Sequence, residues 1–173
     1  MSTTRKFTCE DLLKFNDINL DVLTETYNMS FYLTYLANWP EYFLVKEAPG
    51  GQLMGYIMGK ANGEGDLWHG HVTAVTVAPR YRRLKLAKQL MDSLEHVAEY
   101  AHNAFFVDLF VRVSNAPAIA MYKHFGYDVY RQVIGYYSGE EDAYDMRKAL
   151  PRDPDKRSMV PLGRKILPEE LEW

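Results

Sequence analysis

The chain has 173 residues, 47% hydrophobic and 25% charged, with a formal net charge of −3 at pH 7. These values are typical of one soluble globular domain with a substantial core. The slightly acidic charge argues against a general nucleic-acid-binding protein, and no apolar run approaches the ~20 residues that a membrane helix needs. Nothing resembles a signal peptide, and a single cysteine, Cys9, excludes an internal disulfide and fits a reducing compartment. We therefore expect a cytoplasmic protein.

The first third of the chain predicts a short edge strand followed by helices. Residues 3–7 suit the strand, and Thr8 with Asp11 has the pattern of a helix N-cap and its acidic third position. Large apolar side chains then recur at helical spacing until Pro40: Phe31, Tyr32, Tyr35, Leu36 and Trp39. This aromatic face can pack on a sheet or remain exposed as a partner surface, and the sequence leaves both open.

A hairpin and a central strand come next. Residues 42–46 and 53–60 predict two strands joined around a Pro-Gly-Gly turn. The stretch 68–77 is β-branched and apolar on both faces, as in a strand covered on both sides, and Pro79 ends it because proline cannot donate to a ladder. A long helix is then predicted by apolar residues three or four apart: Leu84, Ala87, Leu90, Met91, Leu94, Val97, Ala98 and Ala101.

The turn between this strand and this helix predicts an anion site. Unpaired backbone N–H groups and the positive end of a helix dipole point at one spot there. A diphosphate is the natural occupant of such a place, and an ordinary solvated basic turn is the alternative. Basic side chains crowd the turn: Arg80, Arg82, Arg83, Lys85 and Lys88.

The remaining chain alternates strands and a helix before its character changes. We expect strands at 105–113, 127–137 and 143–150, with a helix from Ser114 to Gly126. Prolines interleave with charges after residue 150, so we expect residues 1–150 to form one domain and residues 151–173 an extended or disordered tail. The order of elements predicts an α/β (more broadly α+β) fold, a mixed central β-sheet with helices on both faces.

Five segments resemble one family closely. They are similar to the catalytic subunits of NatB N-terminal acetyltransferases, within the GCN5-related N-acetyltransferase (GNAT) superfamily. The matching motifs are spread over residues 7–150. The resemblance implies the GNAT fold and an acetyltransferase that uses acetyl-CoA as cosubstrate and no metal. The segments are Leu23-Thr24-Glu25-Thr26-Tyr27, Trp39-Pro40-Glu41-Tyr42-Phe43, Trp68-His69-Gly70-His71-Val72-Thr73-Ala74, Phe106-Val107-Asp108-Leu109-Phe110-Val111 and Tyr144-Asp145-Met146-Arg147-Lys148-Ala149.

The superfamily's acetyl-CoA signature, Arg/Gln-x-x-Gly-x-Gly/Ala, falls on Arg82, Lys85 and Ala87, and Lys85 departs from the glycine of that pattern. The resemblance implies that backbone N–H groups around residues 75–77 stabilise the oxyanion. It also implies that acetyl-CoA is bound by Val75, Thr76, Val77, Arg82, Arg83, Leu84, Lys85, Leu86, Ala87, Asn115 and Tyr122.

The resemblance further implies catalytic roles for Tyr122, Asn115 and His71. Tyr122 matches a tyrosine near the thioester sulfur and would act as a general acid. Asn115 would bridge substrate or pantetheine, and helix N-capping is its structural alternative. The general base is open between water relays held by Glu25, Tyr27 or His71. The peptide groove would be bordered by Glu25, Tyr27, His71, Thr73, Ala74, Tyr136 and Tyr137.

A metal site is an alternative use of two histidines. His69 and His71 have the spacing to share one face of a strand. No Cys, Asp or Glu cluster accompanies them along the chain, so we expect no zinc site.

The resemblance implies acetylation of chains that begin Met-Asp, Met-Glu, Met-Asn or Met-Gln. Its implied partners are an auxiliary subunit of a NatB-like heterodimer and nascent polypeptides at the ribosome, without direct nucleic-acid or membrane binding. Two alternatives stay open: a small-amine or lysine acetyltransferase of the same fold, and a non-catalytic acyl-CoA-binding subunit.

Overall fold

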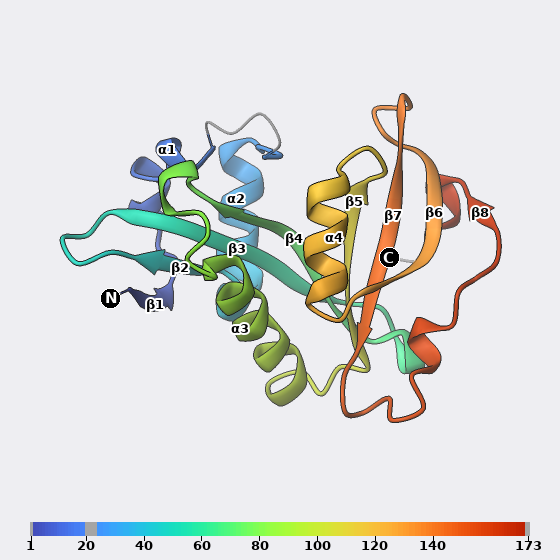
Figure 1. Cartoon of the computed structure of the whole chain (residues 1–173). Coiled ribbons are helices and arrows are strands. Elements are labelled where there is room, and N and C mark those ends of the chain that lie inside the picture. The colour runs from blue at the N-terminus through green and yellow to red at the C-terminus, as the bar shows by residue number, and fades with distance from the viewer. Residues whose placement is uncertain (1, 20–23, 172–173) are drawn as a thin grey trace. The chain divides into compact units, whose positions relative to one another are not determined.

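The computed structural model describes residues 2–19 and 24–171 (Figure 1). Two compact units make up the chain. Unit 1 comprises the residues up to Lys60 together with Val72–Val97, and unit 2 comprises Ala61–His71 and the residues from Ala98 onward. These ranges divide strands β3, Leu53–Asn62, and β4, His69–Val77, and helix α3, Leu86–Tyr100, between the units. Residues 20–23, which include Leu23 of the first resembling segment, lie outside the described residues.

Unit 1 contains the strand order β1-β2-β3-β4. Strand β1, Thr3–Lys6, pairs antiparallel with β2, Leu44–Glu47, which pairs antiparallel with β3, Leu53–Asn62. The predicted hairpin is therefore confirmed. The unit also holds the short helix α1, Asn16–Asn19, and helix α2, Met29–Asn38.

Aromatic rings build much of the core of unit 1. The rings of Phe7 and Phe43 stack with centroids 4.1 Å apart, and Phe15 meets Tyr32 edge-to-face at 5.1 Å. Tyr32 and Tyr35 of α2 are 3% and 6% exposed. The aromatic face of α2 thus packs largely into the core, and its other members, Phe31, Leu36 and Trp39, pack against that core half-buried.

The turn before α3 is longer than the apolar spacing predicts. Helix α3 begins at Leu86, so Leu84, assigned to the helix from sequence, lies in the turn and is 54% exposed. Arg83 and Lys85 adopt left-handed backbone conformations with φ of 64° and 60°. Such residues interrupt a right-handed helix, which explains the late start.

Unit 2 contains the strand order β4-β5-β7-β6-β8. Strand β5, Phe106–Arg112, pairs antiparallel with β7, Glu141–Ala149, and β7 pairs antiparallel with β6, Asp128–Tyr137. Strand β8, Lys165–Ile166, is parallel to β6, so the sheet is mixed, as predicted. Helix α4, Ala116–His124, connects β5 to β6.

The segment 151–171 is folded against unit 2. The Asp153 carboxylate accepts the N–H groups of Arg157 and Ser158, each at 2.9 Å. Ile166 of β8 and Leu171 are buried in a cluster with Val133 of β6. The sequence predicts an extended or disordered tail. In the described residues, a few apolar side chains between the prolines and charges anchor the segment to the edge of the sheet at β6.

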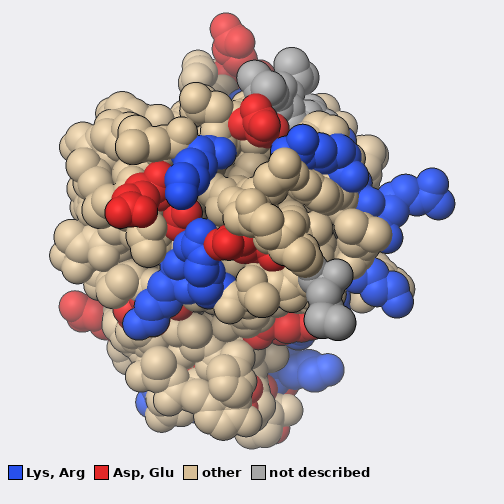
Figure 2. Space-filling view, turned by 90° about the vertical axis from the view of Figure 1, so that its left-hand side faces the viewer, with Lys and Arg blue, Asp and Glu red and all other residues tan. Residues whose placement is uncertain are grey.

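Figure 2 shows acidic and basic side chains interspersed with uncharged residues on one face of the molecule. Among the helices of the described residues, none combines the length and the apolar character that crossing a lipid bilayer requires.

We predict that Lys85→Gly raises the free energy of unfolding by about 1 kcal/mol, because glycine adopts a positive φ without the steric cost that a Cβ incurs. Lys88→Gly is the matched control. It places glycine inside α3 and should lower stability by about 1 kcal/mol. Urea unfolding of both variants measures the difference. Equal destabilisation by the two changes would contradict a strained turn.

Candidate functional site

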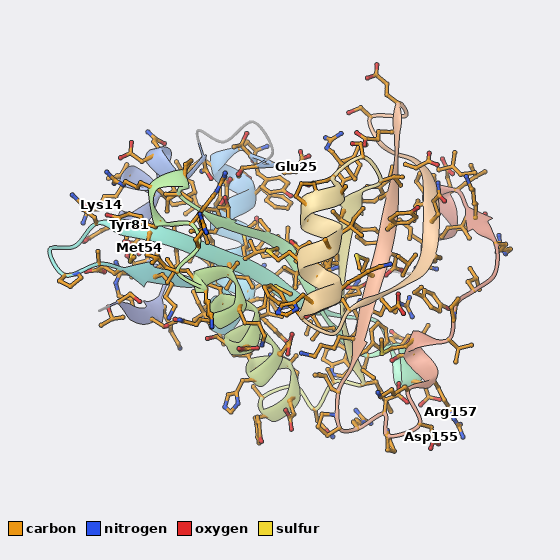
Figure 3. The ribbon with its side chains drawn as sticks, viewed as in Figure 1. Lys14, Glu25, Met54, Tyr81, Asp155 and Arg157 are labelled. Atoms are coloured by element: carbon orange, nitrogen blue, oxygen red, sulfur yellow. The ribbon has the colours of Figure 1, made fainter. Side chains whose placement is uncertain are left out.

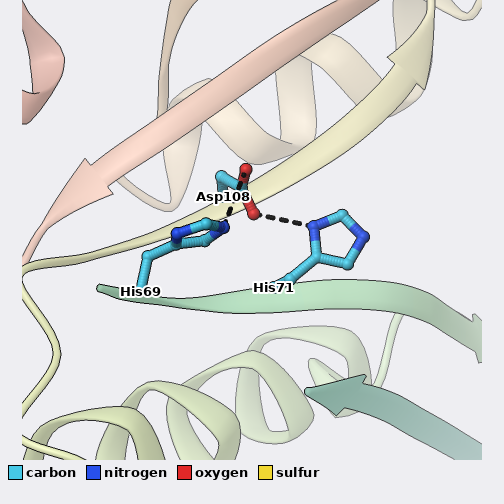
Figure 4. A group of neighbouring side chains, drawn as sticks. All are labelled: His69, His71 and Asp108. Atoms are coloured by element: carbon cyan, nitrogen blue, oxygen red, sulfur yellow. Dashed lines mark hydrogen bonds and ion pairs between the residues drawn. The ribbon is translucent and has the colours of Figure 1, made fainter. Parts of the chain in front are cut away.

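Unit 2 holds a buried cluster of His69, His71 and Asp108 (Figure 4). The two histidines lie on β4 and the aspartate on β5. The His71 Nδ1 atom is 2.7 Å from Asp108 Oδ1, and His69 Nε2 is 3.5 Å from Asp108 Oδ2. All three residues are at most 6% exposed. Because the cluster is buried, the interactions among these three side chains are stronger than they would be in water.

The loop before β4 fixes the ring of His69. Its Nδ1 donates a hydrogen bond to the Leu67 carbonyl oxygen at 2.6 Å, because a carbonyl can only accept. The imidazole also stacks on Phe106, with centroids 4.7 Å apart and planes 6° from parallel. Gly63 has a φ of 83°, and a Cβ there would collide with the Leu67 carbonyl oxygen. The loop therefore requires glycine at this position.

Asp108 is ionised at neutral pH. Burial alone would raise the pKa of its carboxyl group, but the charges of His69 and His71 and the hydrogen bond from His71 lower that pKa to about 2. Arg147 lies directly opposite Asp108 on β7 and acts in the same direction. The Arg147 guanidinium is also bound at 3.3 Å to Asp145, which accepts a 2.8 Å hydrogen bond from Arg131.

A pocket of about 250 Å³ opens beside this cluster within unit 2. Its walls combine the cationic side chains of Arg131 and Arg147 with apolar ones, and Leu171 of the C-terminal segment contributes to them. The complete lining is Asn62, Gly63, Glu64, Leu67, His69, Phe106, Asp108, Phe110, Arg131, Arg147 and Leu171.

The cluster corrects one premise of the sequence interpretation. An acidic residue does accompany His69 and His71, because Asp108 reaches them from a neighbouring strand. Two imidazoles and a carboxylate are donor types that zinc accepts. In this structure the His71 Nδ1 is hydrogen-bonded to the carboxylate, and Arg147 lies opposite Asp108, so the arrangement is that of a hydrogen-bonded cluster. The absence of a metal stays a prediction.

The predicted substrate residues of unit 2 are connected through Phe110. The Phe110 ring is 5.6 Å from that of His71 and stacks on Tyr136 at 4.7 Å. Tyr137 meets Tyr136 edge-to-face at 5.0 Å and lies beneath the Arg112 guanidinium. The structure thus brings together three residues predicted from sequence. Phe110 and Asp108 were missed as site residues, although both belong to a segment that carries the family resemblance.

Helix α4 places the two other predicted catalytic residues. The Asn115 side chain accepts a 3.2 Å hydrogen bond from the Ala118 N–H, so it performs the N-cap role considered from sequence. Tyr122 is buried, with its ring near those of Phe125 and Tyr127. Burial raises the pKa of the Tyr122 hydroxyl to about 12, which keeps its proton in place at neutral pH.

Unit 1 holds the remaining predicted substrate residues. The Tyr27 hydroxyl donates to the Thr73 carbonyl oxygen at 3.4 Å, and the Tyr35 hydroxyl forms a 2.7 Å hydrogen bond with Thr73 Oγ1. Ala74 packs against the aromatic core, and Glu25 is exposed on the segment preceding α2 (Figure 3). Tyr35 was assigned only to an aromatic face from sequence, yet it also orients the Thr73 hydroxyl.

The predicted acetyl-CoA turn also belongs to unit 1. Val75, Thr76 and Val77 end β4, and Thr76 Oγ1 lies 2.9 Å from the hydroxyl of Thr24. The following residues Arg82, Arg83, Leu84 and Lys85 are exposed, whereas Leu86 is buried and Ala87 half-buried at the start of α3. The turn therefore presents its basic side chains to solvent, where an anionic ligand can reach them.

Comparisons with known proteins identify the family. The acetyltransferase (GNAT) family model matches residues 12–127. The chain is 62% identical to the N-terminal acetyltransferase B complex catalytic subunit NAA20 of Arabidopsis thaliana, over 100% of this chain and 99% of that protein. Chaetomium thermophilum Naa20, solved with a bisubstrate analogue, has a TM-score of 0.89 and 44% identity, covering 96% of this chain and 97% of that one. A NatB acetyltransferase complex bound to a bisubstrate inhibitor has a TM-score of 0.87 and 39% identity, with 99% of each chain covered.

The partner prediction is wrong about the role. It centres on the auxiliary subunit of a NatB-like heterodimer, whereas the relatives that match this chain over nearly its whole length are catalytic subunits. The role that the comparisons support is therefore the catalytic one. The α/β class and the GNAT fold with its mixed sheet are confirmed. This chain belongs to the GNAT acetyltransferase family and, within it, to the catalytic subunits of the NatB type of N-terminal acetyltransferase.

Proposed function

We propose that this enzyme transfers the acetyl group of acetyl-CoA to the α-amino group of chains that begin Met-Asp, Met-Glu, Met-Asn or Met-Gln. The observation that carries this proposal is a polar recognition group, His71, held by Asp108 and bordered by aromatic rings, in a chain of the NatB catalytic family. The chain has a single cysteine, which fits a reducing compartment. This supports a cytoplasmic site of action.

The chemistry requires three things of the protein. An α-amino group has a pKa of ~7.7–8.0, so it must lose a proton before its lone pair attacks the thioester carbonyl carbon. The oxyanion that forms needs N–H donors, a role we assign to the backbone of residues 75–77. When the C–S bond breaks, the thiolate of CoA takes a proton, and the protonated Tyr122 hydroxyl suits this step.

Acetyl-CoA binding is assigned to the exposed basic turn before α3. Left-handed conformations at Arg83 and Lys85 give this turn a backbone course that a helix cannot have, and anion-binding concavities are built from such turns. Lys85, which replaces the glycine of the superfamily pattern, adds a positive charge.

Substrate choice follows from the polarity of the two side-chain sites. Aromatic side chains such as Tyr136 and Tyr137 of unit 2 suit the apolar methionine side chain. His71 is assigned to the second side chain, which must be polar, because an apolar residue there cannot form a hydrogen bond with the imidazole.

We predict that Met-Asp and Met-Glu peptides are acetylated far better than Met-Leu or Ser-Ala peptides. His71→Ala should erode this preference by about 1–3 kcal/mol, because it removes a hydrogen bond to a charged group. The control is His96→Ala on the exposed side of α3. Mass spectrometry of a peptide library incubated with acetyl-CoA measures the preference. A wild-type enzyme that favours Met-Leu, or that acetylates only lysine peptides or spermidine, would refute the proposed specificity.

We predict that Tyr122→Phe lowers kcat by about 10²–10⁴-fold while acetyl-CoA affinity is maintained, since only the hydroxyl is lost. Tyr127→Phe, which changes a buried neighbour in the same aromatic group, should leave kcat within a few-fold of the wild type. Steady-state kinetics and calorimetry separate the two quantities. Wild-type kcat in Tyr122→Phe would assign the hydroxyl a purely structural role.

We predict that reversing both charges in Arg82→Glu/Arg83→Glu weakens acetyl-CoA binding severely without unfolding the protein, because both side chains are exposed. Lys6→Glu/Lys14→Glu alters the net charge equally at exposed positions outside the turn and is the control. Isothermal titration calorimetry gives both affinities. Unchanged affinity in the arginine double variant would remove the cofactor site from this turn.

A further inference from the structure

The hydrogen bonds around Asp108 determine which nitrogen of His71 faces away from the cluster. Asp108 is ionised and can only accept, so the 2.7 Å contact requires a proton on His71 Nδ1. Figure 4 shows the other ring nitrogen, Nε2, on the side of the imidazole turned away from Asp108. The tautomer and the orientation of His71 are thus set by one carboxylate from the neighbouring strand.

We propose that Asp108 is a positioning residue for substrate selection: it holds His71 with Nε2 toward the second side chain of the substrate, and its negative charge favours acidic over amide side chains there. This inference rests on the proposed function of His71 and extends it to a residue outside the groove. Asp108 itself acts through His71.

The chemistry explains why one imidazole can serve both substrate classes. With a proton on Nε2, His71 donates to the carboxylate of a Met-Asp or Met-Glu substrate. The imidazolium is then balanced by Asp108 on its other side. Without that proton, Nε2 accepts from the amide N–H of a Met-Asn or Met-Gln substrate. The first mode needs the negative charge of Asp108, and the second needs only a hydrogen-bond acceptor at Nδ1.

The charged groups near Asp108 have other partners, so the charge next to His71 is that of Asp108. Arg131 and Arg147 are both paired with the Asp145 carboxylate, which partly neutralises their positive charge. The Arg147 guanidinium also stacks on the rings of Tyr130 and Phe106, at 3.5 and 4.5 Å from their centroids. Among the described residues, Asp108 is the carboxylate paired with His71 in this cluster.

Asp108→Asn separates charge from geometry. The asparagine Oδ1 can still accept from His71 Nδ1. His69 keeps its hydrogen bond to the Leu67 carbonyl oxygen, which does not involve Asp108. Both of these hydrogen bonds therefore keep their partners, and the negative charge beside the two imidazoles is lost. The matched control is Asp128→Asn, at an exposed position of β6.

The experiment compares kcat/KM for paired peptides that differ only in Met-Asp against Met-Asn. We expect Asp108→Asn to lower the value for Met-Asp by roughly tenfold or more and the value for Met-Asn by less than about threefold, because a charge-assisted hydrogen bond is about twice as strong as a neutral one. Asp128→Asn should leave both values unchanged. Equal losses for both peptides in Asp108→Asn would show that Asp108 only supports the fold and would overturn the proposal.

A second measurement does not depend on turnover. Nitrogen-15 NMR of the histidine rings in the wild-type protein should show His71 protonated at Nδ1, with a strongly hydrogen-bonded proton that moves in Asp108→Asn. A His71 ring protonated only at Nε2 would overturn the proposal even if the variant failed to fold. Wild-type protein that does not acetylate Met-Asp peptides would instead refute the proposed function, and the NMR result would still decide the position of His71.

Discussion

The buried hydrogen bond between Asp108 and His71 is the interaction on which the polar part of the site depends. A carboxylate removed from water is costly unless charges and hydrogen bonds replace its hydration. Here two imidazoles and the opposite Arg147 supply them. The hydrogen bond to Asp108 fixes the ring of His71, and the Leu67 carbonyl oxygen fixes the ring of His69.

Apolar packing around Phe110 also supports His71 and its neighbours. Phe110 lies between His71 and Tyr136, and Phe110 and Tyr136 also pack on the cluster of Val133, Ile166 and Leu171. The C-terminal segment therefore contributes to the support of residues assigned to substrate recognition. The proline-rich and charged composition of the segment conceals this, because only three of its described residues, Asp153, Ile166 and Leu171, are buried.

The strand-to-helix turn uses a different principle. A turn that binds phosphate oxygens needs backbone N–H groups free of helical hydrogen bonds, and left-handed residues provide them. In this chain Lys85 occupies such a conformation where the superfamily has glycine. The Cβ of Lys85 incurs a steric cost in this conformation, and the Lys85 side chain places a positive charge near the expected diphosphate.

Local patterns in the sequence determined most elements: the alternation of strands, the cap at Asn115 and the turn at residues 49–51 all act over a few residues. The family motifs also named His71, Tyr122 and the basic turn. Tertiary structure alone decided that Asp108 meets two histidines 37 and 39 positions away, since pairing between strands sets that contact. It likewise decided the late start of α3 and the docking of residues 165–166, because backbone strain and long-range burial leave no periodic signal in the sequence.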